Sequence, residues 1–154
     1  MSRAFVRESD GSELEDLPDR PVSDHPNLVT AEGLSQIEAQ IADLRRRLAD
    51  AGTSGDRPEA ARVSRDLRYW TRRRATARIV VDEPVVERVR FGSRVTLDRG
   101  GGRQVTYRIV GEDEADPTSG TLSYMSPLAQ ALMGQAIGDA VAVGPTEAEI
   151  IAIA

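Results

Sequence analysis

The chain has 154 residues, of which 40% are hydrophobic and only 4% aromatic, so a helical part joined to a small sheet domain fits better than one large core. Its net charge of -5 argues against general coating of nucleic acid, and the lack of cysteine excludes disulfides and thiolate metal sites and suits a reducing cytoplasm. The single histidine, His25, lies in a polar stretch, which argues against a histidine zinc site or a Ser-His-Asp triad.

The chain offers no long apolar run. Its start, Met-Ser-Arg-Ala-Phe-Val-Arg-Glu, lacks the apolar core of a signal peptide. No stretch reaches the roughly 18 apolar residues that a membrane span needs. We therefore expect a cytoplasmic protein with no membrane partner.

The first segment, residues 1–28, is polar and acidic and is interrupted by Pro18, Pro21 and Pro26. Such a composition buries too little apolar surface to offset the entropy lost on ordering. The sequence therefore predicts a disordered acidic tail.

Two helix-forming runs follow and are joined by a short turn. The first begins at Thr30, a good N-cap, and runs to Ala51; the second runs from Pro58 to about Ile79. Apolar residues recur in both at spacings of three and four, which is typical of paired helices. We therefore predict an antiparallel coiled-coil hairpin over residues 29–83. The apolar seam comprises Leu34, Ile37, Ile41, Leu44 and Leu48 in the first run and Val63, Leu67, Trp70, Ala77 and Val81 in the second, with Arg74 off the pattern.

The tip of this hairpin carries two carboxylates, Asp56 and Glu59, three residues apart at a helix start. This spacing puts both on one side of the helix, where they could share a cation or a water. The same residues fit a capping box, with Asp56 at the N-cap and Glu59 at the third helical position. A purely structural role and an additional role as metal ligands both remain open.

Arginines gather along the two arms. Arg45, Arg46 and Arg47 on one helix lie roughly across from a second triplet on the other, and acidic residues are too few to neutralise them. One interpretation is a solvated helix face; the other is a surface that faces RNA or other phosphates. The second triplet is Arg72, Arg73 and Arg74, and Arg57, Arg62, Arg65 and Arg68 extend the charge toward the tip.

A second domain is predicted over residues 84–154. Residues 94–98 and 104–110 read as strands around a turn rich in glycine, 121–124 as a short strand, and 139–143 with 147–153 as a closing hairpin. Ser126 caps a short helix with Pro127 at its first position. The acidic loop 112–116 lacks the ligand order of a calcium loop and is expected to be a solvated turn. The fold class is α+β, with a helical hairpin followed by an antiparallel sheet domain.

Several of these segments resemble the transcription factors GreA and GreB. The C-terminal resemblance lies in Tyr107-Arg108-Ile109-Val110-Gly111-Glu112-Asp113-Glu114-Ala115-Asp116, in Ser126-Pro127-Leu128-Ala129-Gln130-Ala131-Leu132-Met133-Gly134 and in Gly138-Asp139-Ala140-Val141. Leu28-Val29-Thr30-Ala31-Glu32-Gly33-Leu34 looks like the family's helix start, and Gly55-Asp56-Arg57-Pro58-Glu59 like its tip. The resemblance covers roughly residues 28–154.

The resemblance implies an FKBP-like C-terminal domain that docks on RNA polymerase at the rim of the secondary channel, here through Ser126, Pro127, Asp113 and Glu114. It implies a coiled coil that enters the channel, where Asp56 and Glu59 help hold the second Mg2+ of the polymerase beside the 3′ end of the nascent RNA. The polymerase then cuts backtracked RNA itself. The protein would be a monomer, with no cofactor of its own and no catalysis of its own.

The sequence also departs from the family pattern. Where the family reads Asn-Ala-Glu-Tyr after the tip glutamate, this chain has Ala60-Ala61-Arg62-Val63. Each arm looks about one heptad shorter, which at 1.5 Å per residue removes roughly 10 Å of reach. The shorter arm resembles the regulators of nucleoside diphosphate kinase, which bind polymerase without promoting cleavage.

Three alternatives to a cleavage factor therefore stay open. One is a channel-binding regulator without cleavage activity, and another is a nucleic-acid binder that uses the arginine arm. The third is an FKBP-like prolyl isomerase, which needs an aromatic cradle for which the domain offers only Phe91, Tyr107 and Tyr124.

Overall fold

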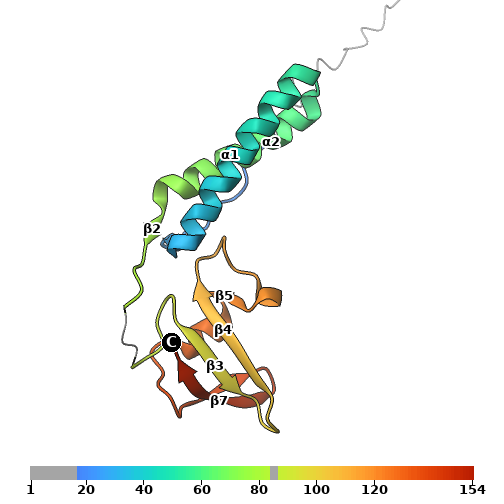
Figure 1. Cartoon of the computed structure of the whole chain (residues 1–154). Coiled ribbons are helices and arrows are strands. Elements are labelled where there is room, and N and C mark those ends of the chain that lie inside the picture. Colours follow the sequence, from blue (N-terminus) through green and yellow to red (C-terminus); the bar gives the residue numbers. More distant parts are fainter. Residues whose placement is uncertain (1–16, 84–86) are drawn as a thin grey trace, which may run out of the picture. The chain divides into compact units, whose positions relative to one another are not determined.

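The computed structural model describes residues 17–83 and 87–154 and divides the chain into two compact units (Figure 1). We call the first, formed by the described residues up to His25 and by Ile37–Thr76, the helical unit. We call the second, formed by Pro26–Gln36 and Ala77–Ala154, the sheet unit. The predicted α+β class is confirmed. The predicted domain borders, 1–28, 29–83 and 84–154, stay a prediction; the two compact units place residues 26–36 and 77–83 in the sheet unit.

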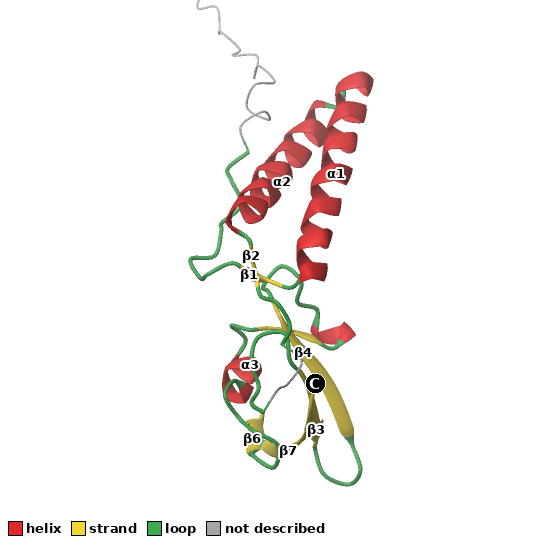
Figure 2. Ribbon diagram, turned by 60° about the vertical axis from the view of Figure 1, so that its left-hand side comes forward, coloured by secondary structure: helices red, strands yellow, loops and turns green. Residues whose placement is uncertain are grey.

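The helical unit is built on two long helices, α1 (Ala31–Ser54) and α2 (Arg57–Thr76), which lie side by side in both views (Figure 2). The predicted hairpin is therefore confirmed. Its core follows the predicted seam, since Ile37, Ile41 and Leu44 of α1 and Val63 of α2 are all buried. Burial of these side chains, each contributing about 1.5–3 kcal/mol, is what holds the two helices together. Supercoiling of the pair stays a prediction.

The end of α2 differs from the prediction. The helix stops at Thr76 rather than near Ile79, so Ala77 and Val81 lie beyond it and Val81 is 79% exposed. The reason is a pair of short parallel strands, β1 (Leu28–Val29) and β2 (Arg78–Ile79). Their backbone hydrogen bonds replace the helical ones, and a two-residue pairing between distant segments leaves no periodic trace in the sequence.

The N-terminal segment also differs from the prediction where it is described. The predicted disordered tail spans residues 1–28, of which 1–16 lie outside the described residues. From Leu17 on, the segment has specific partners: Arg68 donates to the Leu17 carbonyl at 3.1 Å, and Asp19 pairs with Arg68 and Arg72. A composition argument could not find these contacts because they join residues about fifty positions apart.

The sheet unit holds five strands in the order β5-β4-β3-β7-β6. The strands are β3 (Arg94–Asp98), β4 (Gln104–Val110), β5 (Thr121–Ser123), β6 (Ala140–Val143) and β7 (Thr146–Ile153). All neighbours are antiparallel except β4 and β5, which run parallel because the connection through the 3-10 turn η2 (Pro117–Ser119) carries the chain back along the sheet. The predicted strands are confirmed within a residue or two, including the β3–β4 hairpin.

One face of this sheet packs on the short helix α3 (Pro127–Leu132). As predicted, the Ser126 side chain caps α3 by accepting from the Ala129 N–H, and Pro127 takes the first helical position. Fully buried Leu97, Ile109 and Leu132 mark the centre of the core. In the described part of the chain, no helix is long and apolar enough to cross a membrane.

Candidate functional site

The hairpin tip is formed by a tight helix ending and an immediate helix start. The N–H of Asp56 donates to the Ala51 carbonyl at 3.0 Å around Gly55, whose φ of 70° suits glycine. The Asp56 carboxylate then accepts from the Glu59 N–H at 3.1 Å, and the Ala60 N–H donates to the Asp56 carbonyl at 3.0 Å. Asp56 is thus the N-cap of α2. The capping box is only half formed, because the Asp56 N–H is taken by α1 rather than by Glu59.

The second tip carboxylate is held by arginines. Glu59 accepts from Arg47 of α1 at 2.6 Å and from Arg62, one turn along α2, at 3.2 Å. These hydrogen bonds, that of Arg47 first, lower the pKa of Glu59. Asp56 is exposed whereas the Glu59 side chain is only 28% exposed. A cation at the tip would therefore meet one open carboxylate, Asp56, and a second one that two positive charges already neutralise.

The described residues contain no cluster of three or more histidine, cysteine or acidic side chains that could hold a metal ion. The tip pair alone offers too few oxygen ligands for a Mg2+ site. The two tip carboxylates could therefore, at most, add oxygen ligands to a metal ion that another protein holds.

The arginines of α1 are exposed but mostly paired. Arg46 pairs with Asp43 and, at 3.8 Å, with Asp50, while Arg47 belongs to the tip pair described above. Arg45 is exposed, and none of the described residues forms an ion pair with it. The Arg46 pairs lie along one helix and the Arg47 pair joins the two helices; all are screened by solvent and contribute little to stability.

The arginines of α2 do not share one face. Arg73 is 1% exposed, so the prediction that it faces phosphates does not fit the structure. Arg73 lies three residues after Trp70, whereas the predicted seam passed through position 74, where Arg74 stood off the pattern. Arg72 pairs with Asp19, and Arg74 pairs with Glu38 of α1 across the hairpin at 2.9 Å.

The four predicted docking residues lie in the sheet unit with different local roles. Glu114 accepts a hydrogen bond at 2.6 Å from the hydroxyl of Thr30, which caps the start of α1. Ser126 caps α3, Pro127 is exposed, and Asp113 is half-buried. The acidic loop is therefore not simply a solvated turn, because one of its carboxylates anchors a helix start.

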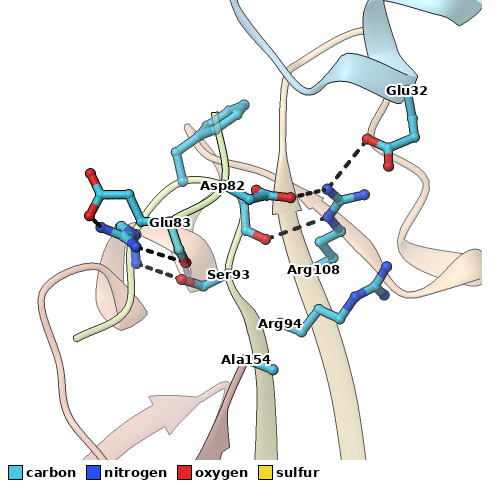
Figure 3. Close-up of a pocket in the computed structure, with 10 residues that line it drawn as sticks. Glu32, Asp82, Glu83, Ser93, Arg94, Arg108 and Ala154 are labelled. Carbon is cyan, nitrogen blue, oxygen red and sulfur yellow. Dashed lines mark hydrogen bonds and ion pairs between the residues drawn. The ribbon is translucent and has the colours of Figure 1, made fainter. Parts of the chain in front are cut away.

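A pocket of about 240 Å³ in the sheet unit was not anticipated from the sequence (Figure 3). At its centre the Arg108 side chain, only 10% exposed, faces Glu32 at 3.4 Å and Asp82 at 3.6 Å. The Glu32 pKa is lowered by its own backbone N–H and then by Arg108. Gly92, with φ 87°, leaves room for Asp82, which a Cβ would meet at 2.8 Å.

The remaining wall of the pocket carries a second ion pair, between Arg90 and Glu83 at 2.6 Å. With Arg94 also in the lining, three arginine side chains face three carboxylate side chains in this pocket. Glu32 and Arg108 are 76 positions apart, so no local pattern could have joined them. Along β4, Arg108 alternates with the polar residues Gln104 and Thr106, so the strand pattern did not single it out.

The family model "Transcription elongation factor, GreA/GreB, C-term" matches residues 83–154. The chain is 35% identical over 139 residues to transcription elongation factor GreB of Xanthomonas axonopodis pv. citri, covering 77% of this chain and 83% of that protein. It is 34% identical over 132 residues to GreA of Desulfovibrio desulfuricans, covering 84% and 78%.

One solved structure resembles the chain at low sequence identity. The chain is 24% identical to the GreA factor homolog 1 protein of Thermus thermophilus, with a TM-score of 0.41, covering 84% of this chain and 99% of that one.

Proposed function

Because the chain belongs to the GreA/GreB family of transcription elongation factors, we propose that it binds RNA polymerase and acts through the secondary channel of that enzyme. The observation that carries this proposal is the extent of the similarity, which covers 77% to 84% of the chain and so includes residues of both units. The sheet unit docks on the polymerase and the hairpin enters the channel. The factor carries out no chemistry of its own.

The structure of the tip favours a regulator that occupies the channel without stimulating RNA cleavage. A cleavage factor must bring carboxylate oxygens to a Mg2+ ion of the polymerase. Here Arg47 and Arg62 form ion pairs with Glu59, so the tip would bring positive charge to the Mg2+ ion of the polymerase together with the carboxylate. Arg62 stands where the family pattern has a glutamate, which reverses one charge beside the metal. Asp56 remains the one exposed carboxylate.

Stimulation of cleavage is the second candidate function, because Asp56 and Glu59 match the acidic pair of the family tip. The pairs that hold Glu59 are exposed, and exposed ion pairs are weak enough to rearrange at a metal ion. If this candidate is right, the amide variants Asp56→Asn and Glu59→Gln lose cleavage but still bind polymerase.

Prolyl isomerase activity finds no support in the arrangement of the aromatic residues. Phe91 and Tyr124 are both buried, and their rings meet edge to face with centroids 5.7 Å apart. Both belong to the core; Phe91 also borders the pocket of Figure 3, but no second aromatic among the described residues lines that pocket. A peptide isomerisation assay is expected to show no rate above background.

The experiment that tests the proposed function is binding to core RNA polymerase and to a stalled elongation complex. The intact chain and a variant with Ser126 and Pro127 both replaced by alanine are compared. Binding that survives in the first and weakens in the second supports docking through the sheet unit. No binding of the intact chain at any concentration tested contradicts the proposal.

A further inference from the structure

Residues 17–25, which we call the strap, lie in the helical unit and are fastened to α2. The Asp19 carboxylate bridges two arginines one helical turn apart: one oxygen accepts from Arg68 Nε at 2.6 Å and the other from Arg72 Nη2 at 2.8 Å. Arg68 also donates to the Leu17 carbonyl at 3.1 Å. A single carboxylate is thus held by two guanidinium groups, as a phosphate group would be.

The next residue of the strap makes a second type of contact. The Arg20 guanidinium lies over the ring of Tyr69, 3.9 Å from its centroid, and pairs with Asp66 at 3.2 Å. A planar guanidinium on an aromatic face occupies the place that a nucleic-acid base takes when it stacks. Arg20 therefore covers a stacking surface directly beside the two arginines that hold Asp19.

The surface under the strap is basic and accessible. Along its length α2 carries seven arginines, of which Arg73 is buried, and two acidic residues. Arg68 and Arg72 keep 42% and 55% of their side-chain surface exposed although they are paired. A groove of about 470 Å³ lined by Ser64, Leu67, Thr71 and these two arginines lies beside them. Ion pairs at such exposures are screened by solvent and can be exchanged for others.

We propose that the strap is a displaceable mimic of a nucleotide, which occupies on α2 a binding surface for single-stranded nucleic acid formed by Arg68, Arg72 and Tyr69. Asp19 takes the place of a phosphate and Arg20 that of a base. Release of the strap exposes both parts of the surface together, because the two contacts belong to adjacent residues. The inference concerns the free protein and does not depend on binding to polymerase.

The experiment compares two variants with the same change of net charge. Asp19→Asn weakens the bridge to both arginines, while Asp24→Asn removes an exposed carboxylate of the strap that pairs with no arginine among the described residues. Binding of a short labelled oligouridylate is followed by fluorescence anisotropy over a range of salt concentrations. Melting temperatures check that both variants remain folded.

The Asp19→Asn variant is expected to bind the oligouridylate about threefold more tightly than wild type, the change that loss of exposed ion pairs produces. Its salt dependence should steepen by about 0.7 for each phosphate newly contacted. Asp24→Asn should bind as wild type does. Adding Arg68→Gln and Arg72→Gln to Asp19→Asn should remove the gain.

Three outcomes would overturn the inference. Equal affinities of the Asp19→Asn and Asp24→Asn variants for the oligouridylate would show that any gain comes from the change of net charge alone. A gain that persists without Arg68 and Arg72 would place binding elsewhere. An equal gain for duplex DNA would remove the stacking role of Tyr69, because paired bases have no free face to offer.

Discussion

Thr30 connects the start of α1 to the acidic loop, and its removal should destabilise the sheet unit measurably. The residue is 2% exposed. Its hydroxyl accepts from the Gly33 N–H at 2.9 Å and donates to Glu114 at 2.6 Å. Thr30→Val keeps the shape of the side chain but removes both hydrogen bonds, whereas Thr30→Ser keeps the hydroxyl and loses one methyl group.

The magnitude follows from these two contacts. Loss of an N-cap costs about 1 kcal/mol. Leaving the Glu114 carboxylate without its donor adds about 1–2 kcal/mol. Thr30→Val should thus lower stability by about 2–3 kcal/mol, and Thr30→Ser by about 0.8 kcal/mol, the value of one buried methyl group. For a chain of this size the valine variant should melt roughly 4–12 °C lower than wild type.

The assay is thermal and urea unfolding followed by circular dichroism. A double-mutant cycle with Glu114→Gln isolates the pair, and we expect a coupling of about 0.5–3 kcal/mol because the two side chains are in contact. If the valine and serine variants melt together, or if the cycle shows no coupling, the hydrogen-bonded chain from Gly33 through Thr30 to Glu114 does not stabilise the fold.

Three further predictions concern single positions. Gly33→Ala should destabilise the protein, because the new Cβ would lie 2.5 Å from Glu114 Oε2. Gly52→Ala on the same helix meets nothing within 4 Å and should stabilise it by about 0.5–1 kcal/mol. Thermal melting of the two variants tests this, and equal shifts of their melting temperatures would contradict it. Because the pKa of Glu59 is lowered, its ion pairs are fully present above pH 4.3 or so, about the ordinary pKa of a glutamate, and are lost as the pH falls through the lowered pKa. An NMR titration should show the pKa of Glu59 rising in the Arg47→Gln variant. An unchanged pKa in that variant would contradict the pairing. Arg62→Glu should increase any cleavage stimulation by polymerase if positive charge at the tip suppresses it, and a variant as inactive as wild type points instead to the length of the arm.

The sequence identifies the elements whose signals are local. The β3–β4 hairpin follows from alternating apolar residues on both sides of three glycines, and α3 from Ser126 and Pro127 at its start. The hairpin seam follows from its period, because the buried faces of two packed helices must repeat with the turn of the helix.

What the sequence could not show depends on contacts between distant segments. The β1–β2 pair ends α2 early, and Asp19 finds its arginines on another element. Asp56 and Glu59 lie at the hairpin tip, but their spacing in the sequence does not reveal that Arg47 of α1 reaches Glu59. Similarly, Arg73 is buried although its charge suggested an exposed position.

The most direct test of the proposed function is a transcript-cleavage assay on a stalled, backtracked elongation complex, with binding of the factor measured in the same sample. The account predicts that the protein binds the complex while the rate of RNA cleavage stays that of polymerase alone at every Mg2+ concentration. Faster cleavage that disappears in the Asp56→Asn, Glu59→Gln double variant would contradict it and assign the tip to metal binding.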